Sequence, residues 1–342
     1  MREQEIIDVE KRQLGPSLDP ASRILVTGGS GFIGTNVVDY YLRARFEVFS
    51  LDINAPQIAA HRSVFTQLDV QDSDVFCNFV EKVRPTHIIH LAARTDLLGR
   101  SVRDYAVNTF GVLNTIRAAA AASVQCVILA SSRLVNAIGY SPRGVRDYNP
   151  TTFYGQSKVQ GELLAFTEKW TPGTTWCIVR PTSIWGPWFG VPYRNFFDHV
   201  LSGRYIHPAG KTVKKSFGYV ENLVFELDRL AGSPAENVHE KTFYLADYEP
   251  IDVLLFARQI AQTSGRRAPQ ECPVAILRCA AKAGDVLKGF GWANVPLTSF
   301  RLNNLLTEMI YNLEDTSAVV GLLPFSNAIG IERTLAWMSK AC

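Results

Sequence analysis

The chain has 342 residues, of which 47% are hydrophobic and 20% charged, a composition typical of a globular protein that excludes a disordered or fibrous one. Its net charge of +3 does not favour binding to nucleic acid, and six cysteines without a Cys-x-x-Cys pair indicate reduced thiols. The charged N-terminus lacks the apolar segment of a secretory signal, and no run approaches the roughly 18 apolar residues of a membrane span. We therefore expect a cytoplasmic protein without stable membrane insertion.

Apolar strands alternate with helices over the first half of the chain. Residues 1–21 are polar and predict an arm outside the core, with one short helix at most. The following segment predicts strands over 23–28, 46–52, 64–70, 86–93, 125–132 and 175–181, and helices over 32–43, 72–83, 101–121 and 154–169. This pattern predicts an α/β fold, a Rossmann-like doubly wound parallel sheet over 22–181. Residues 182–342 lose the regularity and predict a smaller C-terminal part that mainly binds substrate.

The first predicted strand runs into a glycine-rich turn, GGSGFIG, at residues 28–34. Glycines at Gly28, Gly31 and Gly34 permit a tight turn, a close approach of the backbone to a pyrophosphate, and close helix–strand packing. Asp52 ends the second strand, where a carboxylate can bind the hydroxyls of an adenosine ribose and repel a 2′-phosphate. The turn therefore predicts dinucleotide binding, with NAD(H) favoured over NADP(H).

A tyrosine and a lysine, Tyr154 and Lys158, stand four residues apart at the start of a predicted helix and so share one face. A lysine ammonium beside a phenol favours the phenolate, so we expect the pKa of Tyr154 to fall toward neutrality. Ser132 ends the fifth strand and could hold a substrate oxygen. The three side chains predict proton transfer to or from a carbinol.

These motifs, together with HLAA (90–93), LASS (129–132), YGQSK (154–158) and RPTSIWGP (180–187), resemble the extended short-chain dehydrogenases/reductases of the NAD-dependent epimerase/dehydratase family. The resemblance covers roughly residues 23–340. It implies Ser132, Tyr154 and Lys158 as catalytic residues. It implies contacts to NAD from Gly28, Gly31, Phe32, Ile33, Gly34, Asp52, Asp69, Val70, Leu91, Ala92, Ala93, Asn108, Lys158, Pro181 and Ser183.

Departures from the family pattern narrow the range of reactions that the protein could catalyse. Where related dehydratases carry Thr-Asp-Glu, this chain has Ser132-Arg133-Leu134, so the acids that would remove water are missing. The resemblance then favours a nucleotide-sugar epimerase acting at C4 through a transient 4-keto intermediate. The alternatives are a reductase or dehydrogenase of a keto-sugar nucleotide or another carbinol, sterol-like included, and a non-catalytic dinucleotide-binding protein. Arg133, Asn195 and Lys215 are the candidate substrate contacts, the last two in a region that resembles the family's diphosphate-binding segment.

Four further expectations concern assembly, metal binding and packing. The resemblance implies a homodimer formed by the helices near 101–121 and 154–169, with the small residues 118–122 allowing close packing. His87 and His90 stand three apart on a predicted strand, face opposite sides, and predict no metal site. The aromatic residues over 185–193 are interpreted as local core rather than a stacking surface, and the amphipathic segment 274–292 as a helix packed on the smaller part.

Overall fold

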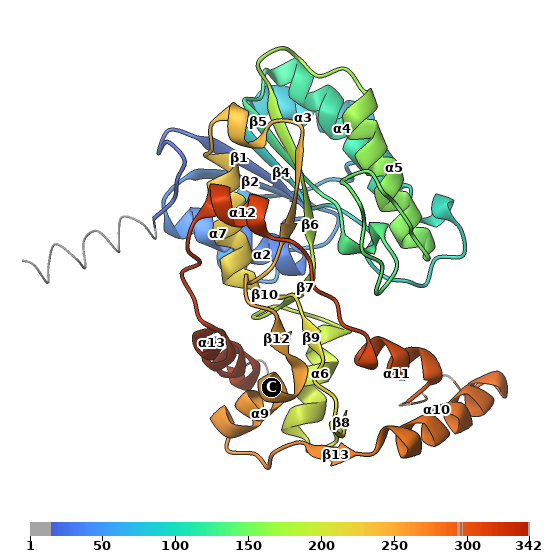
Figure 1. Ribbon diagram of the computed structural model, residues 1–342. Coiled ribbons are helices and arrows are strands. Elements are labelled where there is room, and N and C mark those ends of the chain that lie inside the picture. Colours follow the sequence, from blue (N-terminus) through green and yellow to red (C-terminus); the bar gives the residue numbers. More distant parts are fainter. Residues whose placement is uncertain (1–14, 293–294, 296, 341–342) are drawn as a thin grey trace, which may run out of the picture.

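A computed structural model describes residues 15–292, 295 and 297–340. Its centre is a seven-stranded parallel sheet with the order β11-β6-β5-β4-β1-β2-β3 (Figure 1). The strands are β1 (Arg23–Thr27), β2 (Glu47–Asp52), β3 (Phe65–Gln67), β4 (His87–His90), β5 (Cys126–Ala130), β6 (Thr175–Pro181) and β11 (Lys241–Leu245). The order reverses between β1 and β4, as in a doubly wound sheet, and the predicted fold class is confirmed.

Helices cover both faces of the sheet because successive side chains of each strand point to opposite sides. In β1, Ile24 and Val26 belong to one apolar cluster and Leu25 to the other. On one face lie α2 (Phe32–Arg43) and α7 (Val220–Ala231); on the other lie α3 (Ser73–Val83), α4 (Val107–Ala122) and α5 (Phe153–Thr167) (Figure 1). Short 3-10 turns η1 (Ala59–Val64), η2 (Val102–Tyr105) and η3 (Arg133–Val135) fill connections.

Segments from outside residues 22–181 complete the sheet layers. β11 pairs with β6, and α7 lies against the same sheet, although both come after residue 181 in the chain. At the other end, the Ser17 N–H donates to the Asp228 carboxylate at 2.7 Å, and Leu18 is 7% exposed within the core. Residues 15–18 therefore pack on the sheet layer, whereas residues 19–21 are exposed, and the rest of the predicted arm lies outside the described residues.

The smaller part lies below the carboxyl ends of the strands in Figure 1. Trp185, Phe197 and Phe256 pack at its centre, with ring centroids 4.9–5.8 Å apart, and Phe189 joins them. Of the aromatic residues over 185–193, Trp185 and Phe189 are core, as predicted, whereas Trp188 and Tyr193 are only half-buried. The part contains β7 (Ser183–Trp185), β8 (Ile206–Pro208), β9 (Lys214–Lys215), β10 (Phe217–Tyr219), β12 (Ile251–Asp252), β13 (Gln270–Cys272), α6 (Tyr193–Leu201), α9 (Val253–Thr263) and α13 (Asn327–Lys340); α8 (Ala235–Val238) and α12 (Glu314–Val320) border the large sheet.

A helical hairpin, α10 (Val274–Gly289) and α11 (Ser299–Leu306), projects from the smaller part (Figure 1). It is held together by a small cluster of Leu277, Ala281 and Leu302. Phe290 and Trp292, which directly follow α10, are exposed apolar side chains. The expected packing of 274–292 is thus mainly onto α11. Within the described residues, no helix is long and apolar enough to cross a membrane.

Candidate active site

Close backbone contacts explain the glycines of the turn between β1 and α2. Gly28 has a φ of +72°, and a Cβ there would lie 2.7 Å from the backbone nitrogen of Ala92. A Cβ on Gly34 would overlap the carbonyl oxygen of Gly28. Gly31 precedes α2, and within the described part of the chain no side chain caps this helix, so its first N–H groups can bind an anion. The turn therefore fits a pyrophosphate held close to the backbone.

Asp52 lies at the end of β2 and holds the glycine turn in position. Its two carboxylate oxygens accept hydrogen bonds from the N–H groups of Ser30 at 3.1 Å and Asn54 at 2.9 Å. The other residues predicted to contact the cofactor follow the same sheet edge: Phe32 and Ile33 in the first turn of α2, Asp69 and Val70 after β3, Leu91, Ala92 and Ala93 after β4, Pro181 at the end of β6, and Ser183 in β7. This edge contains the point where the strand order reverses, which is where such sheets bind ligands.

Ser132, Tyr154 and Lys158 come together at the carboxyl end of β5. The Thr152 side chain caps α5 and sets its first turn, which places Tyr154 and Lys158 on one face. The three side chains belong to residues that are 9%, 6% and 5% exposed, respectively. The hydroxyl of Ser132 is hydrogen-bonded to Tyr154, while the Lys158 Nζ donates to the carbonyl oxygen of Ala130 at 2.9 Å. The structure thus brings the predicted catalytic groups into one buried site.

The protonation of Tyr154 differs from the prediction. Burial raises the pKa of Tyr154 to about 12, although the Ser132 hydrogen bond and the charge of Arg133 lower it. Burial also lowers the pKa of Lys158 to about 8, while the carboxylate of Glu162 raises it. The expectation that Lys158 brings the pKa of Tyr154 toward neutrality is therefore wrong for the protein alone, because the loss of hydration outweighs the nearby charges. Tyr154 is a neutral phenol that can donate a proton.

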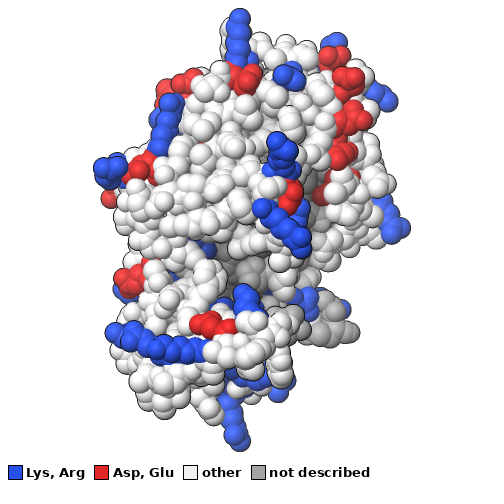
Figure 2. All heavy atoms as spheres, turned by 90° about the vertical axis from the view of Figure 1, so that its right-hand side faces the viewer, with Lys and Arg blue, Asp and Glu red and all other residues white. Residues whose placement is uncertain are grey.

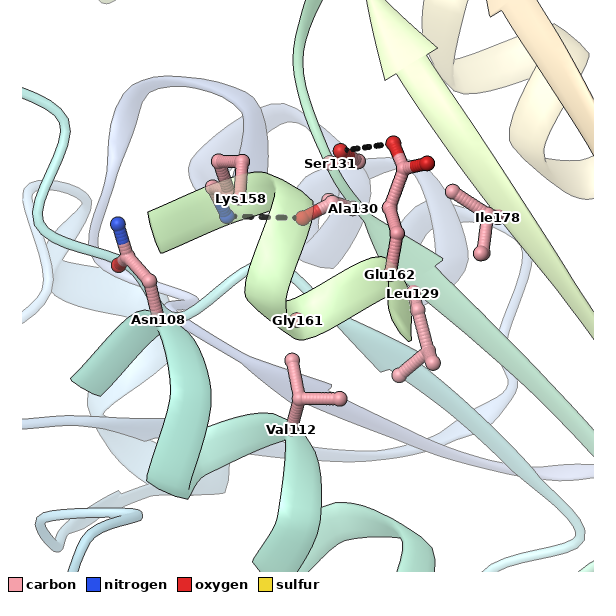
Figure 3. A pocket seen from close by; sticks show the side chains of 9 residues that line it. All are labelled: Asn108, Val112, Leu129, Ala130, Ser131, Lys158, Gly161, Glu162 and Ile178. Carbon is pink, nitrogen blue, oxygen red and sulfur yellow. Dashed lines mark hydrogen bonds between the residues drawn. The ribbon is translucent and has the colours of Figure 1, made fainter. Parts of the chain in front are cut away.

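Lys158 lines a small cavity together with other buried polar groups (Figure 3). The cavity has a volume of about 10 Å³, enough for about one water molecule. Glu162 accepts a hydrogen bond from the Ser131 hydroxyl at 2.5 Å and forms an ion pair with Arg180 at 2.6 Å. Sequence analysis missed Glu162 and Arg180. The available signal was the repeated spacing of four residues from Tyr154 to Lys158 to Glu162, which puts all three on one face of α5.

Asn108 joins the edge of the sheet to α5. Its side-chain amide donates to the hydroxyl of Ser157 at 2.9 Å and to the carbonyl oxygen of Arg94 at 3.1 Å, and its Oδ1 accepts the Arg94 N–H at 2.9 Å. These bonds fix the loop after β4 against the helix that carries Tyr154. A direct contact between Asn108 and the cofactor stays a prediction.

Two of the three candidate substrate residues are buried, and the third is exposed. Arg133 and Lys215 are both buried, and burial lowers the pKa of Lys215 to about 8, with a further contribution from the charge of Arg133. Asn195 is exposed in the first turn of α6, and its side chain forms no hydrogen bond with the described residues. Tyr193 and Tyr311, which sequence analysis did not select, place their hydroxyls against Arg133. No local pattern singles out Tyr311, which follows α11 by five residues.

Within the described residues, no group of three or more His, Cys, Asp or Glu side chains could hold a metal ion. His87 and His90 bond separately to Thr86 and Thr27, each at 2.8 Å.

Charged side chains are interspersed on the face shown in Figure 2, which is hollowed between the sheet layer and the smaller part.

A dinucleotide turn, a doubly wound sheet and a buried tyrosine–lysine pair together define a short-chain dehydrogenase/reductase of the extended type. The family model for the NAD-dependent epimerase/dehydratase family matches residues 24–246, and the chain belongs to that family. It is therefore an NAD-dependent enzyme, either an epimerase or a dehydrogenase. The alternative of a non-catalytic binding protein is set aside. The glycine turn and Asp52 fit NAD, which supplies hydride acceptance and donation when bound.

Two curated relatives indicate different substrates. The chain is 31% identical to the 3β-hydroxysteroid dehydrogenase/Δ5→4-isomerase of Mycobacterium tuberculosis over 72% of this chain and 71% of that protein. It is 22% identical to the N-acetyl-α-D-glucosaminyl-diphospho-ditrans,octacis-undecaprenol 4-epimerase of Escherichia coli O157:H7 over 92% of this chain and 94% of that protein.

Solved structures agree on the fold. The UDP-glucose 4-epimerase of Thermotoga maritima superposes with a TM-score of 0.70 at 20% identity, covering 93% of this chain and 99% of that one. The UDP-glucose 4-epimerase of Thermus thermophilus in complex with NAD gives a TM-score of 0.68 at 23% identity, covering 94% of this chain and all of that one. At these identities the likeness concerns the fold.

Proposed function

We propose that this enzyme is a nucleotide-sugar epimerase that acts at C4 through a transient 4-keto intermediate. The observation that carries the proposal is the buried site in which Ser132, Tyr154 and Lys158 meet beside the dinucleotide turn. The E. coli 4-epimerase, similar over almost the whole chain, supports the choice of sugar chemistry. The absence of an acid pair at Arg133 and Leu134 argues against dehydration.

The chain's own groups account for the proton transfers. The Ser132 hydroxyl holds the substrate oxygen, and Tyr154 exchanges a proton with it as the carbon changes between carbinol and ketone. Lys158, fixed to Ala130 at 2.9 Å, keeps a positive charge near the phenol and favours its charged form when the proton leaves. Rotation of the keto sugar in the site then allows protonation after hydride returns to the opposite face.

A steroid dehydrogenase is the second candidate, favoured by the 31% identity to the mycobacterial 3β-hydroxysteroid enzyme. It would use the same three side chains for one oxidation and would not return the hydride. The third candidate is a reductase of a keto-sugar nucleotide, which would catalyse only the reduction of the ketone.

A substrate panel tests these functions. The purified protein with NAD is incubated with UDP-glucose, UDP-galactose, UDP-glucuronate and their N-acetylated counterparts, and products are assigned by proton NMR. In parallel, 3β-hydroxysteroids with NAD are followed by the absorbance of reduced nicotinamide. Inversion at C4 without net cofactor reduction supports the epimerase. Steroid-dependent reduction with inert nucleotide sugars would replace it by the second candidate.

A further inference from the structure

Tyr105, at the end of η2 and two residues before α4, lies against the ring of Tyr154. The two ring centroids are 6.0 Å apart, and the ring planes are inclined by 60°, a geometry in which aromatic rings attract each other. Tyr105 is 1% exposed. Its ring therefore forms part of the wall around the phenol that is expected to transfer the proton.

The hydroxyl of Tyr105 is bound to the loop of residues 94–100, which comes after β4. It accepts a hydrogen bond from the N–H of Gly99 and donates one to the carbonyl oxygen of Asp96, each at 2.9 Å. The guanidinium of Arg94 lies over the Tyr105 ring, 5.1 Å from its centroid, and donates to the carboxylate of Asp96 at 2.7 Å. Because the hydroxyl has a donor and an acceptor in the loop, the loop sets the position of the ring.

Gly99 brings the loop directly against the edge of this ring. A Cβ at Gly99 would lie 2.3 Å from Cε2 and 2.6 Å from Cζ of Tyr105. Carbon atoms in contact normally lie about 3.5–4.0 Å apart, so the loop has no space for even a methyl group. The ring could make room only by breaking its hydrogen bonds to the loop or by changing its contact with Tyr154.

A second connection runs from the same loop to the backbone of Tyr154. Asn108 accepts the N–H of Arg94 and donates to the hydroxyl of Ser157, each at 2.9 Å. The Ser157 hydroxyl in turn donates to the carbonyl oxygen of Tyr154 at 2.7 Å. These hydrogen bonds hold the backbone of Tyr154 and leave the orientation of its ring to the side chains packed against it.

We propose that Tyr105 is a positioning residue, which orients the phenol of Tyr154 toward the reacting carbinol and takes its own position from the loop of residues 94–100. The inference rests on the proton-transfer role of Tyr154 in the proposed function. It does not depend on the substrate, because a nucleotide sugar and a steroid would use the same phenol. A misplaced phenol slows the reaction, since acid–base catalysis requires the hydroxyl within hydrogen-bond reach of the substrate oxygen.

Substitutions of Tyr105 test the role of its ring in turnover with NAD and the substrate that the panel identifies. Tyr105→Leu removes the ring and should lower kcat by about 10-fold or more, with a smaller change in KM. Tyr105→Phe keeps the ring and should retain kcat within about 3-fold of the wild type. Tyr41→Leu makes the same change at another position of 1% exposure, on α2, and should leave kcat per folded molecule unchanged. Equal losses of kcat in both leucine variants would overturn the proposal.

Gly99→Ala tests the role of the loop without removing an aromatic ring. The added methyl would displace Tyr105 and should lower kcat by about 5-fold or more, whereas Gly144→Ala, where a Cβ meets nothing within 4 Å, should not. In the Tyr105→Leu background, Gly99→Ala should have little further effect, since the ring that it would strike is gone. Losses that multiply in the double variant would contradict the proposed connection from loop to ring.

The orientation of Tyr154 can also be followed without a substrate. In protein labelled with fluorotyrosine, the fluorine resonance that disappears in Tyr154→Phe belongs to Tyr154. This resonance should shift in Tyr105→Leu and Gly99→Ala and stay in place in Tyr41→Leu. A Tyr154 resonance that stays in place in all three variants would overturn the proposal.

A double-mutant cycle separates this proposal from the proposed function. Tyr105→Leu should lower the residual turnover of Tyr154→Phe by less than about 2-fold, because both substitutions act through the same hydroxyl. An undiminished loss in the Tyr154→Phe background would overturn the positioning role and leave the proposed function in place. Turnover of a steroid alone would replace the proposed function, whereas the same cycle measured with that steroid would still support the positioning role.

Discussion

At the scale of single residues, burial decides the chemistry of the site more than neighbouring charges do. Tyr154 is 6% exposed, and burial raises its pKa to about 12 although the charge of Arg133 lowers it. Lys158 is equally buried and has a pKa of about 8. In the protein alone, Tyr154 is therefore a neutral phenol, and Lys158 is an ammonium group that loses its proton more readily than usual. Ionisation of the phenol must then depend on the bound cofactor and substrate.

Tyr154→Phe tests the proton-transfer role. Removal of the hydroxyl should reduce turnover by about 100-fold or more, the usual size of an acid–base contribution, and leave NAD affinity nearly unchanged. Steady-state rates and a cofactor titration measure the two effects. Turnover close to that of the wild type would remove Tyr154 from the mechanism.

Glu226 lies fully buried on α7, where burial and the carboxylate of Asp247 raise its pKa well above the usual range. A raised pKa means that the folded protein prefers the protonated acid, so stability is lost as the pH rises from about 4.5 toward the folded pKa. Glu226→Gln keeps the shape without the charge and should raise the Tm at pH 8 by about 2 °C or more, with a smaller gain at pH 5. Glu236→Gln, at an exposed position, is the control, and equal Tm values for wild type and Glu226→Gln at pH 8 would contradict the argument.

At the scale of elements, short contacts between segments set the site. The glycine turn touches the loop after β4 through Gly28 and Ala92, and α2 begins directly against the turn at Gly34. α5 is tied to β6 by the pair of Glu162 and Arg180. Each contact leaves little room for a different side chain, and each can be tested by a single substitution.

Gly34→Ala should abolish or greatly weaken NAD binding. The added Cβ would overlap the Gly28 carbonyl oxygen, so the turn must open before α2 can form. Fluorescence titration with NAD measures the loss. Gly144→Ala, where a Cβ meets nothing within 4 Å, is the matched control and should bind NAD like the wild type. Unchanged NAD affinity in Gly34→Ala would exclude this turn as the dinucleotide site.

Glu162→Gln should destabilise the protein by about 3–5 kcal/mol, because it leaves the Arg180 guanidinium buried without its counter-charge. Denaturant unfolding at neutral pH measures the change in the free energy of unfolding. Glu168→Gln, just after α5 at an exposed position, should change it little. Similar stabilities for the two variants would show that the buried pair is not needed.

At the scale of the whole molecule, α4 and α5 lie side by side on the outer face of the sheet (Figure 1). Of the small residues expected at a dimer interface, Ala118 and Ala119 are buried within the chain, whereas residues 120–122 are at least partly exposed. Exposed large apolar side chains on the same two helices include Phe110, at 56% exposure, and Leu163, at 43%. These two residues are further candidates for the proposed contact between copies.

The homodimer remains a proposal with a direct test. The double substitution of Phe110→Lys and Leu163→Lys should convert a dimer into a monomer, because it places charges in the apolar contact. Light scattering at micromolar concentration gives the mass. Leu322→Lys changes a residue that is 91% exposed on another surface and should leave the dimer intact. A wild-type monomer would refute the proposal outright.

Local patterns in the sequence were sufficient for the repeated strands and helices, the dinucleotide turn, and the Tyr154–Lys158 pair, because periodicity, glycine spacing and a separation of four residues act over short distances. Other features depend on residues far apart in the chain. Arg133 meets Met309 across 176 positions, and β11 joins β6 only once the chain has crossed the smaller part. Burial also follows from this packing, and with it the raised pKa of Tyr154 and the low exposure of Arg133 and Lys215. A side chain loses its hydration only when distant segments of the chain pack over it. Local sequence patterns therefore cannot predict this loss or the pKa shift that it causes.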